Sequence, residues 1–297
     1  MTEQFKMDAP ATARRLDEMA QGLVGAPLDR PEGPLKVTGT ATYANEWQVD
    51  GMVHGVMVRA PGNSGRVVLA NRDDVAKMPG VLAVIQDERL LRNPAQGTAN
   101  KAPIQGPDHA SYLGQLIAVV VAEGFEQARH AAQSLKGELE NGEVMPVDPA
   151  TAAVEPQEAK TLDQGDLDGA MQEAAFSVDV TYTTPSHSSS PMEPHASIAS
   201  WDGDDLTLRG SYQMLKYNRN ELSDALGIHP DRLRILSPYV GGGFGSKLGI
   251  APEAVAAAIA AKEVGRPVSV ALQRPQVYEA TMRRSETTQR VRLAADA

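Results

Sequence analysis

The chain has 297 residues, of which 42% are hydrophobic and 22% charged, so it can form two domains of ordinary size, each with its own core. Its 28 basic and 38 acidic residues give a net charge of -10, which disfavours nucleic acid and anionic membrane surfaces as partners. Without a cysteine, the chain can hold neither a disulfide nor an iron–sulfur cluster. Any redox chemistry therefore requires a bound cofactor or partner subunits.

Residues 1–34 predict an amino-terminal arm, because short helical pieces alternate with Pro/Gly-rich ones and the segment ends in Pro31-Glu32-Gly33-Pro34. The arm lacks an apolar run of signal-peptide length, and the longest apolar run of the chain, Leu116–Ala122, has only the length of a strand. We therefore expect no membrane span and, by default, a cytoplasmic location. A periplasmic location would require export together with a signal-bearing partner.

Residues 35–143 predict a small α+β domain. Alternating or β-branched apolar residues predict strands over 52–59, 81–85 and 116–122. Apolar residues at helical spacing predict helices over 73–78 and 125–135. Residues 144–164 follow as a linker, since this stretch is rich in Glu, Pro and Ala and has little periodicity.

Residues 165–297 predict a second mixed α+β domain. Its strands are expected over 176–184, 206–213, 267–272 and 289–294. Its helices are expected over 216–226 and 252–264, ended by Gly227 and Gly265. No turn follows the last strand, so we expect its partner strand on another polypeptide, or a truncated product with an exposed strand edge.

The loop from Gly241 to Lys247 (GGGFGSK) is the sharpest chemical feature of the sequence. Four glycines around Phe244, directly after a strand pattern, would let the backbone approach a bulky ligand closely. The spacing matches neither a Walker A loop nor the dinucleotide motif G-x-G-x-x-G. From spacing alone, a cofactor cradle and a structural Gly-rich turn are equally supported, and an unrelated nucleotide-binding protein is a weaker alternative.

A second polar segment contains His187, Glu193 and His195. Two prolines in this segment prevent the regular helix that would align such groups as metal ligands, so we favour a structural or supporting role over metal binding. Gln213 follows a predicted strand, where a neutral amide could donate to an oxo group without adding charge. An equally supported interpretation is that Gln213 closes the strand by bonding to backbone.

Three stretches in this order resemble the xanthine oxidase and aldehyde oxidase family of molybdenum hydroxylases: 33–43 (GPLKVTGTATY), 192–197 (MEPHAS), and 237–240 (SPYV) before the Gly-rich loop. Trp201 and the pair Gln213-Met214 fit the same pattern, which is closest to the large subunits of bacterial periplasmic aldehyde oxidoreductases. The resemblance implies an α+β fold in which an α/β hammerhead domain, 35–143, precedes the first and here incomplete molybdenum-cofactor-binding domain, 165–297.

The resemblance also implies a cofactor, a reaction and partners. The cofactor is a molybdopterin, usually its cytosine dinucleotide form, bound by Gln213 and by the loop residues Gly242, Gly243, Phe244 and Gly245. The reaction is hydroxylation of an aldehyde or N-heterocycle carbon with oxygen from water. Iron–sulfur and FAD groups are expected on partner subunits.

The chain departs from the family pattern in two ways. Ser246 stands where the family usually has glycine, and the Gly-Val-Gly-Glu segment that carries the catalytic Glu has no counterpart. We therefore expect no catalytic residue and no protein metal ligand in this chain, and a second polypeptide that supplies the Glu. The alternative is a truncated remnant that acts only as a structural or interaction module.

Overall fold

A computed structural model of the chain describes residues 26–91, 108–140, 162 and 164–296. Most of the predicted arm and nearly all of the predicted linker lie outside these residues, and the domain boundaries stay a prediction. Contacts divide the chain into two units, residues 1–41 and 42–297. In the first unit, helix α1 (Gly33–Val37) occupies the end of the Pro/Gly-rich segment, because a proline in the first turn of a helix sacrifices no hydrogen bond.

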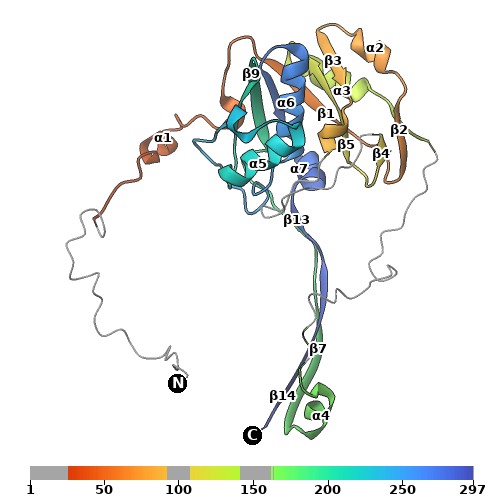
Figure 1. The fold of residues 1–297 in the computed structure, drawn as a ribbon, viewed down its shortest axis with the longest axis vertical. Helices are drawn as coiled ribbons and strands as arrows, with labels where there is room; N and C mark the ends of the chain where they lie inside the picture. The colour runs from red at the N-terminus through yellow and green to blue at the C-terminus, as the bar shows by residue number, and fades with distance from the viewer. Residues whose placement is uncertain (1–25, 92–107, 141–161, 163, 297) are drawn as a thin grey trace. The chain divides into compact units, whose positions relative to one another are not determined.

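A seven-stranded sheet forms the centre of the second unit, in the order β11-β10-β9-β12-β1-β5-β3 (Figure 1). Its strands are β1 (Val53–Arg59), β3 (Val81–Ile85), β5 (Leu116–Ala122), β9 (Ala196–Asp202), β10 (Asp205–Gly210), β11 (Leu233–Leu236) and β12 (Val268–Ala271). The parallel pairing of β1 with β12, in which Val53 lies opposite Val268, joins the two predicted domains in one sheet.

The two faces of the sheet bury different side chains because residues alternate along each strand. On one face, Val56 and Val120 belong to a core with helix α3 (Phe125–Ser134), drawn entirely from the first predicted domain. On the other face, Met57 and Val119 belong to a core with helix α6 (Pro252–Val264) and strands β9 to β12. The expectation of one separate core for each domain is therefore wrong, because the larger core is shared between them.

Helix α5 (Leu215–Leu226) and α6 end where the sequence predicts. Gly227 and Gly265 close them with φ of 69° and 66°, the left-handed conformation that glycine adopts without strain. The smaller elements are β2 (Gly65–Leu69), α2 (Arg72–Ala76), β4 (His109–Ala110), β6 (Gly137–Glu140), α4 (Leu167–Glu173), β8 (His187–Ser188), α7 (Arg274–Ala280) and β13 (Arg283–Arg284). No helix among the described residues has the length and hydropathy of a bilayer span.

Strands β7 (Phe176–Thr184) and β14 (Thr287–Ala295) pair antiparallel along their whole length. The prediction that the last strand finds its partner on another polypeptide is therefore wrong. Its partner is β7, more than a hundred residues earlier in the chain, and Leu293 lies opposite Val178. The apolar face of this ribbon is open to solvent at Phe176, Val178, Tyr182 and Leu293.

Candidate functional site

The Gly-rich loop follows β11 and presents mainly backbone to its surroundings. Gly242 and Gly245 have φ of 95° and 92°, which L side chains rarely adopt. Phe244 has a φ of 49°, and among the described residues it is the one non-glycine with positive φ. Its side chain is 78% exposed and is therefore turned away from the protein. Such strained backbone persists only where surrounding contacts hold it.

Gln213 lies directly against this loop. A Cβ at Gly243 would collide with the side-chain oxygen of Gln213, so only glycine allows this approach. The Gln213 Oε1 accepts hydrogen bonds from the backbone N–H of Gly245 and of Lys247, both at 3.2 Å. The Gln213 N–H in turn donates to the Lys247 carbonyl at 2.9 Å. The structure thus brings together Gln213 and the loop residues that the sequence singled out.

These bonds decide which end of the Gln213 amide is available. Because two backbone N–H groups donate to Oε1, the orientation of the amide is fixed and its Nε2 points away from these donors. Nε2 makes no hydrogen bond within the described part of the chain, and the side chain is exposed. The interpretation that Gln213 bonds to backbone is therefore confirmed for its oxygen, whereas donation by its NH2 group to an oxo group stays a prediction.

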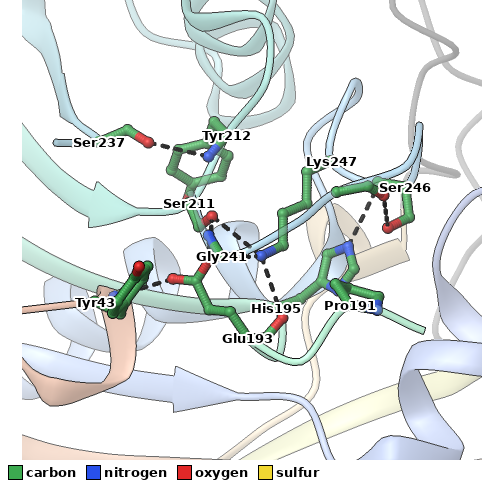
Figure 2. A network of polar contacts seen from close by, with 12 residues as sticks. Tyr43, Pro191, Glu193, His195, Ser211, Tyr212, Ser237, Gly241, Ser246 and Lys247 are labelled. Atoms are coloured by element: carbon green, nitrogen blue, oxygen red, sulfur yellow. Dashed lines mark hydrogen bonds and ion pairs between the residues drawn. The ribbon is translucent and has the colours of Figure 1, made fainter. Parts of the chain in front are cut away.

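Glu193 and Lys247 form a buried ion pair behind the loop (Figure 2). The Lys247 Nζ lies 2.9 Å from the Glu193 Oε2, and the two side chains are 0% and 6% exposed. The same oxygen accepts from the Ser211 hydroxyl and from the Gly241 N–H, both at 2.6 Å. Burial raises the pKa of Glu193, but the hydrogen bonds from Ser211, Lys247 and Gly241 outweigh it and hold the pKa below its usual value.

His195 supports the loop from the same segment. Its Nε2 donates to the Ser246 carbonyl at 3.1 Å, while its buried Nδ1 has no hydrogen-bond partner among the residues that the structure describes. Burial lowers the pKa of His195 to about 4, so the ring is neutral at pH 7. The supporting role predicted for Glu193 and His195 is confirmed by these contacts. His187 is exposed on β8 and takes no part in them.

Ser246 is buried and faces inward. Its hydroxyl donates to the carbonyl of Gly243 at 2.8 Å, so the group that departs from the family pattern is used inside the loop.

Two parts of this arrangement were not predicted from sequence. The first is the pairing of Glu193 with Lys247, because nothing in either segment indicates that they meet. The second is Glu253 in α6, which is 1% exposed and accepts a hydrogen bond from the Ser197 hydroxyl at 3.2 Å. Burial raises the pKa of Glu253 to about 7. A single carboxylate in the otherwise apolar PEAVAAAIAA segment was the available signal.

Two family models match the chain in the order of its segments. Residues 38–142 match the aldehyde oxidase and xanthine dehydrogenase a/b hammerhead domain, and residues 151–297 match the molybdopterin cofactor-binding domain. The chain therefore belongs to the aldehyde oxidase and xanthine dehydrogenase family of molybdenum hydroxylases, with the α+β fold of a hammerhead domain followed by a molybdenum-cofactor-binding domain.

Particular relatives share most of this chain but are much longer. It is 42% identical to the aldehyde oxidoreductase molybdenum-binding subunit PaoC of Escherichia coli K12, over 98% of this chain and 40% of that subunit. It is 29% identical to the nicotine 6-hydroxylase large subunit of Paenarthrobacter nicotinovorans, over 84% of this chain and 33% of the relative. The aldehyde oxidoreductase of Desulfovibrio gigas superposes with a TM-score of 0.76 at 25% identity, over 90% of this chain and 32% of the other. The chain thus spans less than half the length of these relatives.

Proposed function

We propose that this chain contributes one side of a molybdopterin site in an enzyme that hydroxylates a substrate carbon with oxygen from water. Gln213 and residues 242–245 would hold the cofactor. The observation that carries the proposal is the Gln213 amide, whose oxygen is bound by the loop and whose NH2 group is left to donate. The aldehyde oxidoreductase name of the 42% identical relative favours an aldehyde as the substrate class.

The residues present fit such a group. Among the loop side chains only that of Phe244 is exposed, while Ser246 and Lys247 are buried, so the backbone can approach a bulky, anion-bearing ligand. Gln213 adds a neutral donor, which can bond to an oxo group without adding a charge. When bound, a molybdopterin supplies the two-electron redox chemistry that no side chain of this chain can provide. We assign it the cytosine dinucleotide form, and we assign the iron–sulfur and FAD groups to partner subunits.

The base for the reaction would come from outside these residues. Both oxygens of Glu193 are occupied, Oε2 by the donors described above and Oε1 by the Ala44 N–H at 3.2 Å. Glu253 is enclosed in the core and cannot reach a substrate. We assign the catalytic carboxylate to a second polypeptide, which would correspond to the part of the relatives that this chain does not span.

Co-expression tests this proposal. The chain purified alone should contain little molybdenum and reduce no dye with an aldehyde, because it holds one side of the site and no base. Together with a polypeptide that corresponds to the rest of PaoC, it should gain both molybdenum and turnover. Stoichiometric molybdenum with turnover from this chain alone would overturn the division of the site. A complex that forms but never binds molybdenum would favour the alternative, a structural module.

A further inference from the structure

Both ends of the Gly-rich loop converge on one buried carboxylate. The loop begins at Gly241, whose N–H donates to the Glu193 Oε2 at 2.6 Å. It ends at Lys247, whose Nζ donates to the same oxygen at 2.9 Å and to the Glu193 carbonyl at 3.2 Å. Glu193 therefore closes the seven residues 241–247 into a ring, although it lies 54 residues before Lys247 in the sequence.

The strand end that carries Gln213 is tied to the same pair. Ser211, which directly follows β10, donates to the Glu193 Oε2 at 2.6 Å and accepts from the Lys247 Nζ at 3.0 Å. Figure 2 shows Glu193, Ser211, Gly241 and Lys247 meeting at this point. The ion pair thus holds two segments together, the loop and the strand end two residues before Gln213.

The backbone of Lys247 continues this connection to the Gln213 amide. The Lys247 N–H donates to Gln213 Oε1 at 3.2 Å, and the Lys247 carbonyl accepts from the Gln213 N–H at 2.9 Å. Anchoring of the Lys247 side chain therefore fixes the backbone groups that orient the amide. Movement of Lys247 would remove one of the two donors that hold Oε1 and loosen the orientation of the Gln213 side chain.

We propose that Glu193 and Lys247 are positioning residues that set the Gly-rich loop and the direction of the Gln213 amide. A buried ion pair is a poor way to stabilise a core, because an apolar pair of similar volume often serves equally well or better. The geometric contribution of this pair is specific, since Glu193 binds both ends of the loop and Lys247 also binds Ser211 beside the strand end. The proposal rests on the proposed function only in assigning a cofactor to the NH2 group of Gln213. The positioning of the loop itself can be measured without cofactor.

Hydrogen–deuterium exchange on the purified chain gives the test. The variants are Lys247→Met, Glu193→Gln and the double variant, with Glu253→Gln as a control that alters a buried carboxyl whose hydrogen bond goes to Ser197 and not to the loop. In Lys247→Met and in the double variant, we expect the amides of Gly245 and Lys247 to exchange about tenfold faster, as for the loss of one hydrogen bond. The double variant should regain most of the thermal midpoint that Lys247→Met loses, because no unpaired charge remains buried.

The outcomes separate positioning from simple stabilisation. Faster loop exchange in a double variant of restored stability supports the proposal, provided that Glu253→Gln leaves the loop unchanged. A double variant that regains both stability and loop protection overturns it, and so does one that fails to fold, since the pair would then be a determinant of the fold. Molybdenum binding with the second polypeptide is measured separately, so its failure in the wild-type protein would count against the proposed function alone.

Discussion

The amide of Gln213 can be tested one end at a time. Gln213→Ala removes the donor and the loop acceptor together, and we expect assembly with the second polypeptide to survive while the chemical step slows about a hundredfold. Gln213→Glu keeps an oxygen for the Gly245 and Lys247 N–H groups and replaces the NH2 donor with a second, negatively charged oxygen. It should therefore keep the loop protected from exchange and still slow turnover. Rates within about twofold of wild type for both variants would place Gln213 outside the site.

Glu253 predicts a pH dependence of stability with a definite sign. Its folded pKa of about 7 lies above the ordinary value of 4.5, so the folded state binds the extra proton between these values. The stability contribution of this group is fully present below pH 4.5 and is lost as the pH rises through 7. Glu253→Gln cannot ionise, so its stability relative to wild type should rise between pH 5 and 8.5, by up to about 3 kcal/mol.

Urea denaturation of both proteins at the two pH values measures this difference. The neutral His195 titrates in the opposite sense, since its folded pKa of about 4 makes the protein lose stability as the pH falls below 6.5. That contribution is common to both proteins and cancels in the comparison. A stability difference that stays constant between pH 5 and 8.5 would show that Glu253 ionises in the folded protein as it does in water.

The contacts of the site were less predictable than its residues. The resemblance of the sequence to known molybdenum hydroxylases singled out Gln213 and the Gly-rich loop, and the structure places them in contact. Glu193 and Lys247 both stand in segments that the sequence singled out, yet their pairing was not foreseen. Such a pairing depends on how β9, β10 and the loop meet in the sheet, and no local pattern encodes that arrangement.

At the scale of elements, the structure confirms the predictions that depend on local pattern alone. Strand β5 and helices α5 and α6 match their predicted ranges closely, because a buried run, helical spacing and a closing glycine are all local signals. Strand β9 (ASIASWD) was missed, since its small residues give little contrast between faces. The partner of β14 was wrongly assigned because register between strands so far apart in sequence has no local signature.

The ribbon of β7 and β14 carries a prediction about association. An exposed apolar face on a two-stranded ribbon is expected to pair with another surface. In isolation we therefore expect self-association, and in the complex we expect this face to contact the second polypeptide. Val178→Ser with Leu293→Ser should reduce both, whereas Thr183→Ala with Thr288→Ala, a cross-strand pair on the opposite face, should not. Sedimentation of the chain alone measures self-association, and co-purification measures binding to the partner. If the two double variants behave alike, this face is not the surface that associates.

At the scale of the whole molecule, the shared sheet makes one folding unit of two family domains. Strand β1 pairs with β12, and one face of β1 and β5 packs against the core beneath α6. Removal of the second family segment, which supplies β12 and α6, would expose this face to solvent. The sequence could not show this, because each segment has the composition and patterns of a domain. The boundary between the two family models therefore does not mark a boundary in the main core.

One cooperative transition follows from that shared core. Val119 on β5 and Val270 on β12 are both fully buried in it, one from each segment. Val119→Ala and Val270→Ala should each lower the free energy of unfolding by about 2 kcal/mol, as for a truncated core side chain. In a Trp47→Phe background, fluorescence reports Trp201, whose indole N–H bonds to the Ala258 carbonyl in α6 at 2.8 Å. Both variants should shift the Trp201 transition and the circular dichroism transition together, because two-state unfolding makes different probes coincide. If Val119→Ala leaves the Trp201 midpoint in place while the dichroism splits into two steps, the segments unfold independently and the sheet is not one unit.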